Sequence, residues 1–260
     1  MTVPASEAEG LDPRPLHARI AADLRDEIMS GDLAAGAKLP STAQLKDRFD
    51  ASNATIQKAV QLLKDEGLAV GRAGAAVTVR EKRQRTVRPT ASLTPAAEGS
   101  AYPWLSKVSE EQSSARSTLL AVEEVGAFGD IAAALGRPEG SPVVCRRQLI
   151  SIDDEPAELV HSYYPPEIAR GTVLEVPRRI RGGTPTLLAE LGFRPRRSVD
   201  RVSARVATQE QYTALRLPGD LPVLRTLRTV YDEDDRPVEA TVMVKAGHLY
   251  ELQYEFAPEA

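Results

Sequence analysis

The sequence contains a single cysteine, Cys145, and only three histidines in 260 residues. One cysteine excludes an internal disulfide and any cysteine-based zinc site. The histidines His17, His161 and His248 do not have the spacing of a metal-binding motif. No nucleophile stands beside a recognisable base, and Cys145 is interpreted as a small strand residue. We therefore expect no metal, no cofactor and no enzymatic activity.

Long apolar runs are also absent. The longest run without Asp, Glu, Lys or Arg is Pro89–Ala97, which has nine residues, whereas a membrane-spanning helix needs about 20 apolar residues. The first ten residues, MTVPASEAEG, lack the basic start and the apolar stretch of a signal peptide. We therefore expect a soluble, cytoplasmic protein that does not contact a membrane.

What the sequence does contain is enough apolar material for packed cores and an uneven distribution of charge. Hydrophobic residues make up 42% of the chain, and its length suits one large domain or two ordinary ones. Arg14–Thr90 carries 14 Lys/Arg against 9 Asp/Glu, and Ala91–Ala260 carries 19 against 25. The net charge of −4 argues against non-specific binding to nucleic acid. A basic front half followed by an acidic rear half is nevertheless typical of a nucleic-acid-binding module joined to a second domain.

A change in composition marks the boundary between the two halves. The stretch Ala91–Pro103 is rich in Ala, Ser, Pro and Gly, and it follows the basic run Arg80–Arg88. We interpret this region as a linker, whose basic part is solvated, contacts phosphate or folds back onto the acidic second domain. The predicted organisation is a disordered tail (residues 1–13), a first domain (14–80), a linker (81–114) and a second domain (115–257).

Three helical patterns follow one another in the first domain. The first is an apolar stripe that recurs every four residues and ends at a glycine: Leu16, Ile20, Leu24 and Ile28. The second begins after Ser41, which has the spacing of a capping box with Gln44. The third begins after the N-cap Ser52, and its apolar residues are Ile56, Ala59, Val60 and Leu63. Two β-type runs, Leu68–Val70 and Val77–Val79, then enclose a glycine-containing tip, and this order predicts a winged helix-turn-helix.

The segment Pro15–Gly74 resembles the DNA-binding domain of the GntR family of bacterial transcription regulators. The motifs that carry the resemblance are Pro15-Leu16, Gly31-Asp32-Leu33-Ala34-Ala35-Gly36, Leu39-Pro40-Ser41, Ser52–Thr55, Glu66-Gly67-Leu68 and Arg72-Ala73-Gly74. Two positions of the third helix that are usually arginine in this family are Asn53 and Gln57 here. Arginine recognises guanine, whereas Asn and Gln pair with adenine, so this chain is expected to bind a different operator from its relatives.

The expected DNA-binding site is centred on the third helix, because a recognition helix contacts base edges with its N-terminal residues. We expect Asn53 and Gln57 to read bases. Phosphate contacts position the protein without reading the sequence, and a glycine in the wing permits a close approach to the minor groove. The residues that complete the predicted site in these ways are Ser41, Thr42, Ser52, Thr55, Lys58, Arg72 and Gly74.

The second half has an α+β pattern that predicts a mostly antiparallel sheet backed by helices. The strand-like runs are Ser117–Val122, Val143–Ile152, Ala157–Tyr164, Arg201–Ala207, Leu221–Tyr231, Val238–Lys245 and Tyr250–Phe256. The helical patterns are Gly126–Leu135, Pro185–Leu191 and Gln209–Leu215. Acidic turns at Asp153–Pro156 and Asp232–Arg236 are expected to close antiparallel hairpins.

This half resembles the UTRA effector domain of the HutC branch of the GntR family. The resemblance rests on the hairpin QLISIDDEPAELVHSYYP, the run LAELGF and the hairpin VYDEDDRPVEATV, in this order behind the first domain. It implies a chorismate-lyase-like fold that senses a small molecule. The candidate effector-binding residues are Arg147, His161, Tyr163, Arg228, Glu239, Thr241 and His248. Two arginines favour an anionic or zwitterionic metabolite, and the alternative for each residue is a solvated or ion-paired strand position.

These observations lead to one principal hypothesis and two alternatives. The principal one is a homodimeric transcription repressor that binds double-stranded DNA at a near-palindromic operator and responds to a small effector. Two recognition helices are needed because one helix covers only a few base pairs. The alternatives are a lyase-type enzyme and an effector-independent DNA-binding dimer.

Overall fold

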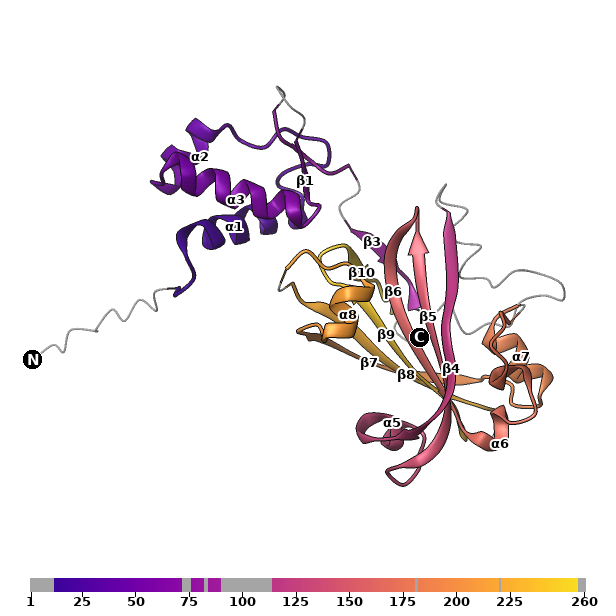
Figure 1. The fold of residues 1–260 in the computed structure, drawn as a ribbon. Helices are drawn as coiled ribbons and strands as arrows, with labels where there is room; N and C mark the ends of the chain where they lie inside the picture. Colours follow the sequence, from indigo (N-terminus) through magenta and orange to yellow (C-terminus); the bar gives the residue numbers. More distant parts are fainter. Residues whose placement is uncertain are drawn as a thin grey trace, which may run out of the picture. The chain divides into compact units, whose positions relative to one another are not determined.

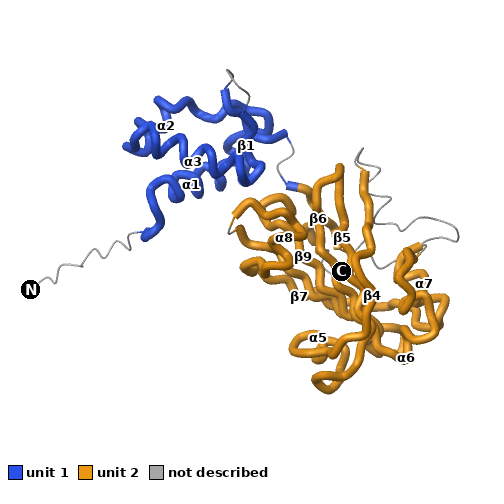
Figure 2. The backbone as a smooth tube through the Cα atoms, viewed as in Figure 1, with its two compact units in different colours: residues 1–84 blue, residues 85–260 orange. Residues whose placement is uncertain are grey.

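The chain, drawn in Figure 1, folds into two compact units, Met1–Gln84 (unit 1) and Arg85–Ala260 (unit 2), which Figure 2 colours separately. The computed structural model describes residues 12–71, 76–81, 84–89, 114–180, 182–219 and 221–256. Most of the predicted tail and most of the predicted linker lie outside the described residues. In the part of the chain that is described, no helix has both the length and the apolar character of a membrane span.

Unit 1 has the element order that the sequence predicts. Its described elements are α1 (Leu16–Ser30), α2 (Thr42–Phe49), α3 (Asn53–Asp65), β1 (Ala69–Val70) and β2 (Thr78–Val79). The two short strands pair antiparallel and form the base of the wing, while residues 72–75 at its tip lie outside the described residues. The winged helix-turn-helix is therefore confirmed.

The core of unit 1 consists of the apolar residues that the helical periodicity selects. Its fully buried members on α1 and α3 are Ile20, Ala21, Leu24, Ile28, Ile56, Ala59 and Leu63, of which only Ala21 lies outside the predicted stripes. Leu16, the first residue of α1, stays 36% exposed, and Val60 is only partly buried. Burial of one large aliphatic side chain contributes about 1.5–3 kcal/mol, so the contact between α1 and α3 holds the third helix in place.

Both predicted helix caps are present. The backbone N–H of Gln44 donates to Ser41 Oγ (3.3 Å), and the backbone N–H of Ser41 donates to Gln44 Oε1 (2.8 Å), which completes a capping box. The backbone N–H of Thr55 donates to Ser52 Oγ (3.2 Å) at the start of α3. Asp50 ends α2 with a φ of 46°. Local sequence therefore determines where α2 and α3 begin and how the turn between them is made.

Unit 2 is built on a six-stranded antiparallel sheet with the order β4-β5-β6-β9-β8-β7. These strands are β4 (Ala115–Ala127), β5 (Ser141–Ile152), β6 (Glu155–Tyr164), β7 (Arg197–Arg205), β8 (Val223–Tyr231) and β9 (Pro237–Ala246). The predicted sheet is confirmed. β4, however, continues to Ala127, where the sequence predicts a helix from Gly126, because its whole length pairs with β5.

Helices pack on both faces of this sheet (Figure 1). One face carries α5 (Gly129–Ala134) and α8 (Gln209–Ala214), and we call it the α5 face. The other face is covered by α6 (Pro166–Ala169), the 3₁₀ turn η2 (Val173–Glu175) and α7 (Thr184–Glu190), and we call it the α7 face. The sequence predicts α5, α7 and α8, but it carries no clear periodicity for α6 and η2, which are too short to show one.

A short strand lies inside the segment that the sequence assigns to the linker. β3 (Arg85–Val87) pairs in parallel with β10 (Tyr250–Leu252) at the end of unit 2. Arg85 Nη2 donates to Asp153 Oδ2 at 2.6 Å, and Arg88 Nε donates to Gln253 Oε1 at 2.8 Å. This end of the basic run therefore folds back onto unit 2, which is one of the three alternatives that the sequence left open.

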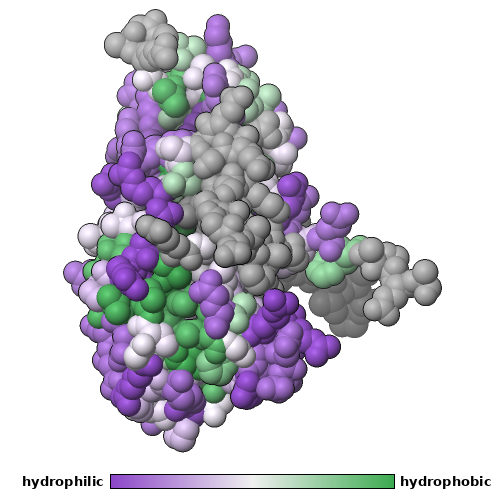
Figure 3. Space-filling model, turned by 90° about the vertical axis from the view of Figure 1, so that its right-hand side faces the viewer, coloured by the Kyte–Doolittle hydropathy of each residue, from purple (hydrophilic) through white to green (hydrophobic). Residues whose placement is uncertain are grey.

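Unit 2 exposes large apolar side chains on both edge strands of its sheet, β4 and β7. Figure 3 shows a patch of apolar residues on one face of the molecule, framed by hydrophilic surface. The described residues of unit 2 include several large apolar side chains with high exposure: Leu120, Phe128, Val176, Val199, Val202 and Val206. Exposed apolar patches on a soluble protein mark surfaces that contact other molecules.

Candidate functional site

The third helix of unit 1 presents a polar face to the solvent. Asn53 and Gln57 lie one turn apart and are exposed, while Ile56 between them is fully buried. Gln61, one turn further on, is also exposed, but its Nε2 donates to Asp65 Oδ1 at 2.7 Å. The N-terminal half of α3 therefore offers two amides in the geometry that a recognition helix requires.

The other residues of the predicted DNA site lie around the start of α2 and α3. Ser41, Thr42, Ser52 and Lys58 are exposed, and Thr55 is half-buried. The hydroxyl groups of Ser52 and Thr55 lie 2.9 Å apart and are hydrogen-bonded to each other. Ser52 Oγ also caps α3, so both hydroxyls have a partner within the protein besides any phosphate. Arg72 and Gly74 lie outside the described residues.

Two ion pairs that the sequence reasoning missed fix the helices of unit 1 relative to one another. Arg25 of α1 donates through Nε (2.8 Å) and Nη2 (2.5 Å) to the carboxylate of Glu66 at the end of α3. Arg48 of α2 pairs with Glu27 of α1. Glu66 is 8% exposed, so its pair is largely shielded from water. The sequence carries no local signal for this pair, because its two residues are 41 positions apart.

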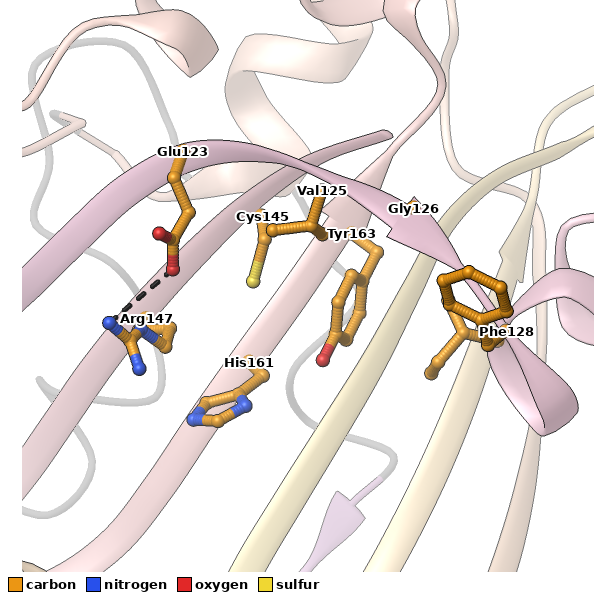
Figure 4. Close-up of a pocket in the computed structure, with 9 residues that line it drawn as sticks. Glu123, Val125, Gly126, Phe128, Cys145, Arg147, His161 and Tyr163 are labelled. Carbon is orange, nitrogen blue, oxygen red and sulfur yellow. Dashed lines mark ion pairs between the residues drawn. The ribbon is translucent and has the colours of Figure 1, made fainter. Parts of the chain in front are cut away.

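In unit 2 the first three candidate effector residues share the α5 face. Arg147 stands opposite His161 in the register between β5 and β6, and directly opposed residues point to the same face. Tyr163 lies two residues along β6 and so points the same way. All three line one cavity with a volume of about 350 Å³ (Figure 4).

The cavity also contains two residues that the sequence reasoning missed. Glu123 of β4 faces Arg147 across the cavity, with 3.3 Å between Oε1 and Nη2. Phe128 places its ring at the opposite end of the cavity (Figure 4). The sequence held no signal for either, because only the register of β4 against β5 brings them to this face.

Three other candidate residues lie on the α7 face. Arg228 and Thr241 are opposite each other in the register between β8 and β9, and Glu239 is two residues from Thr241. All three are buried. Thr241 Oγ1 donates to Glu239 Oε1 at 2.5 Å, and Arg228 donates twice, at 2.7 Å, to the carboxylate of Asp200 on β7. Burial raises the pKa of Glu239, which favours the protonated acid.

The structure therefore divides the candidate effector residues Arg147, Tyr163, Arg228 and Glu239 between the two faces of the sheet. The sheet lies between the first two and the last two, because adjacent strand residues alternate between faces and the register decides which residues meet. His248 belongs to neither group, since it lies buried in the turn between β9 and β10.

Arg146 occupies the α7 face beside the second group and is only 1% exposed. Its Nη1 donates to the carbonyl oxygens of Val173 (3.3 Å), Leu174 (2.8 Å) and Val176 (3.0 Å), and its Nη2 donates to that of Arg178 (2.7 Å). Burial lowers the pKa of this guanidinium, but arginine remains charged in proteins. Arg146 thus ties the segment around η2 to the sheet.

The position of Cys145 agrees with its interpretation as a small strand residue. It is buried on β5, and desolvation raises the pKa of its thiol to about 11. A thiol with this pKa is protonated near neutrality and is a poor nucleophile. Across the described ranges, no three His, Cys, Asp or Glu residues are grouped so that they could hold a metal ion.

Comparison with known proteins agrees with this architecture. Residues 16–79 match the family described as bacterial regulatory proteins, gntR family, and residues 110–251 match the UTRA domain. An HTH-type transcriptional regulator of Streptomyces coelicolor is 30% identical over 241 residues, which cover 89% of this chain and 88% of that protein.

Solved structures share the fold. A crystal structure described as a GntR-family transcriptional regulator aligns with a TM-score of 0.61 at 24% identity, over 95% of this chain and 99% of that chain. The effector domain of PhnF from Mycobacterium smegmatis aligns with a TM-score of 0.53 at 19% identity, over 66% of this chain and 100% of that chain. This chain therefore belongs to the GntR family of bacterial regulators: it is a DNA-binding transcription regulator rather than an enzyme, and a UTRA domain follows its winged helix.

Proposed function

We propose that this protein is a cytoplasmic repressor that binds a near-palindromic operator as a homodimer, and that a small effector changes its affinity for this operator. The observation that carries the proposal is the exposed N-terminal half of α3, where Asn53 and Gln57 point away from a fully packed core. The side chains proposed for phosphate contacts come from the starts of α2 and α3: Ser41, Thr42, Ser52, Thr55 and Lys58. We also assign Arg72 and Gly74 of the wing to the DNA-binding site.

We place the effector on the α7 face, at the buried polar group formed by Arg228, Thr241 and Glu239. Arg228 and the nearby Arg146 supply positive charge, which favours an anionic or zwitterionic ligand. Glu239 and Thr241 supply hydrogen-bonding oxygens. In the structure Arg228 is paired with Asp200, and Thr241 with Glu239, so a ligand at this site exchanges these contacts for its own.

A route from this site to the DNA-binding unit starts at Arg228. Its Nη2 donates to the carbonyl oxygen of Pro89 at 3.2 Å, and Pro89 follows β3 by only two residues. Residues 80–84 are all that separates β3 from β2 of the wing. An effector that binds Arg228 competes for this guanidinium, so it can loosen or tighten the attachment of the chain that leads to unit 1.

The role of Arg228 can be tested by replacement with lysine or glutamine. Without effector, we expect either variant to bind operator DNA with the affinity of the parent. In the parent, effector binding should change the free energy of DNA binding by about 1–3 kcal/mol, and most of this change should be lost in the variants. Operator affinity is measured by fluorescence anisotropy with and without each member of a panel of anionic metabolites. The matched control is Arg201→Gln, because Arg201 is an exposed arginine on the neighbouring strand β7. A full effector response in both Arg228 variants would exclude this route, and no response of the parent to any metabolite would exclude sensing.

Assembly is a separate prediction. We expect a homodimer held mainly through unit 2, where the exposed apolar side chains supply contact surface. Two recognition helices are then positioned on half-sites related by a twofold axis. Sedimentation or light scattering at micromolar concentration should give twice the mass of one 28.2 kDa chain. A monomeric mass both with and without operator DNA would contradict the dimer.

A further inference from the structure

The cavity on the α5 face is separate from the proposed effector site, which lies across the sheet. Its volume of about 350 Å³ falls at the lower end of the range for ligand pockets, about 300–1,000 Å³. Charged groups gather at one end, where Glu123, Arg147 and His161 meet, and Phe128 lies at the opposite end (Figure 4). Ile131 adds a second large apolar side chain to the lining. A small molecule with one polar and one apolar end matches this arrangement.

The charged end carries two carboxylates for one guanidinium. Arg147 Nη2 lies 3.3 Å from Glu123, and Arg147 Nη1 lies 3.2 Å from Glu210 of α8. Both distances exceed the 2.7–2.9 Å that is typical of a strong charge-assisted hydrogen bond. The side chains of Glu123 and Glu210 are 47% and 48% exposed, so each can turn toward a ligand at little cost.

Two buried nitrogen atoms at this end make no hydrogen bond: Nε of Arg147 and Nε2 of His161. The nearest acceptor recorded for His161 Nε2 is Glu210 Oε1, at 3.5 Å. Desolvation lowers the pKa of His161, so its ring is neutral near pH 7 and Nε2 can carry a hydrogen to donate. Burial also raises the pKa of Cys145 and of Tyr163, so neither adds charge to the cavity. A ligand with acceptor oxygens would recover the free energy that unpaired buried donors cost.

The apolar end is shaped by an aromatic ring over a glycine. Phe128 is 62% exposed although it is large and apolar. Its ring approaches Gly126 so closely that a Cβ at that position would lie 2.7 Å from Cε2 of the ring. Gly126 therefore lets the ring rest against β4, where one face of it remains available to a ligand.

We propose that this cavity binds a zwitterionic α-amino acid with an apolar side chain, at a site distinct from that of the effector on the α7 face. The carboxylate accepts from Arg147 Nε and His161 Nε2, the ammonium group pairs with Glu123, and the side chain packs on Phe128 and Ile131. A simple carboxylate would add a third negative charge beside Glu123 and Glu210, and a simple amine would leave both buried donors unpaired. Only a ligand that carries both charges satisfies all of these groups.

Calorimetric titration of the full chain with L-phenylalanine and L-leucine tests the proposal. We expect both to bind, whereas 3-phenylpropionate, phenethylamine and L-serine, which lack the ammonium, the carboxylate and the apolar side chain respectively, bind at least about tenfold more weakly. Arg147→Gln and Glu123→Gln should each reduce the affinity for L-phenylalanine by about tenfold or more. The control variant is Arg201→Gln, because Arg201 is exposed and lies in the same cross-strand row as Arg147. It should leave the affinity for L-phenylalanine unchanged.

Several results would overturn the proposal. The first is that neither amino acid binds. The second is that 3-phenylpropionate or phenethylamine binds as tightly as L-phenylalanine. The third is that Arg147→Gln keeps both the affinity of the parent for L-phenylalanine and its melting temperature. If Phe128→Ser converted a dimer into a monomer while neither amino acid bound to the parent, the cavity would belong to a contact between two copies of the chain. That outcome would also overturn the amino-acid proposal. It would leave the proposed function untouched, because the effector response is measured separately, through DNA affinity.

Discussion

Replacement of Asn53 or Gln57 by alanine is expected to weaken operator binding by about 5- to 150-fold, which corresponds to the 1–3 kcal/mol that one good base contact provides. Each side chain is exposed on the N-terminal half of α3, and its removal leaves the buried stripe of this helix unchanged. Because an amide side chain pairs with adenine through N6 and N7, the variants should also lose their preference for one or two A·T pairs. Binding of a library of operator sequences measures both effects.

The matched control for this experiment is Gln61→Ala. Gln61 is an exposed glutamine on the same helix, one turn beyond Gln57, but its amide donates to Asp65 within the helix. We expect this variant to change operator affinity little. If Asn53→Ala and Gln57→Ala weakened binding to operator and to random DNA equally, both residues would have to be reassigned to contacts with the phosphate backbone.

Replacement of Arg146 by methionine is expected to destabilise unit 2 by at least about 3 kcal/mol. The change removes one buried guanidinium, which donates to four carbonyl oxygens around η2. The carbonyl oxygens of Val173 and Val176 keep a backbone N–H donor, whereas those of Leu174 and Arg178 lose the guanidinium, and an unsatisfied buried polar group costs about 1–3 kcal/mol. For a unit of this size, 1 kcal/mol corresponds to about 2–4 °C in Tm. Scanning calorimetry should therefore show the transition of unit 2 about 6–12 °C lower, with the transition of unit 1 unchanged.

Arg201→Met serves as the control, because Arg201 is exposed on the edge strand β7 and surface changes usually stay within about 0.5 kcal/mol. An Arg146→Met variant with the Tm of the parent would contradict the anchoring role. In that case water would have to reach the carbonyl oxygens of the η2 segment and replace the guanidinium.

The DNA-binding unit was predictable almost element by element, because its signals are local. The capping box at Ser41 and the cap at Ser52 act within three residues of themselves, and the apolar stripes of α1 and α3 repeat within single helices. Its ion pairs were not predictable. Arg25 and Glu66 are 41 residues apart, and no local pattern indicates that they meet.

The sheet of unit 2 was predictable as a set of strands, but the grouping of its side chains was not. Arg146 and Arg147 are neighbours in sequence, yet one ties the η2 segment to the α7 face and the other lines the cavity on the α5 face. Which of them shares a face with Arg228 depends on three intervening strand registers. A shift of one residue in any register would reverse the answer.

The sequence by itself determined the class of protein: a winged helix-turn-helix with two amides, Asn53 and Gln57, at the start of its third helix, followed by an antiparallel α+β domain. Periodicity, caps and family motifs suffice for this because each is complete within a few residues. Only the tertiary structure decided that β3 leaves the predicted linker to pair with β10, and that the candidate ligand residues of the sheet lie on two different faces. The reason is physical: β3 is three residues long and binds a strand at the far end of the chain, so the free energy that orders it comes from pairing partners distant in sequence.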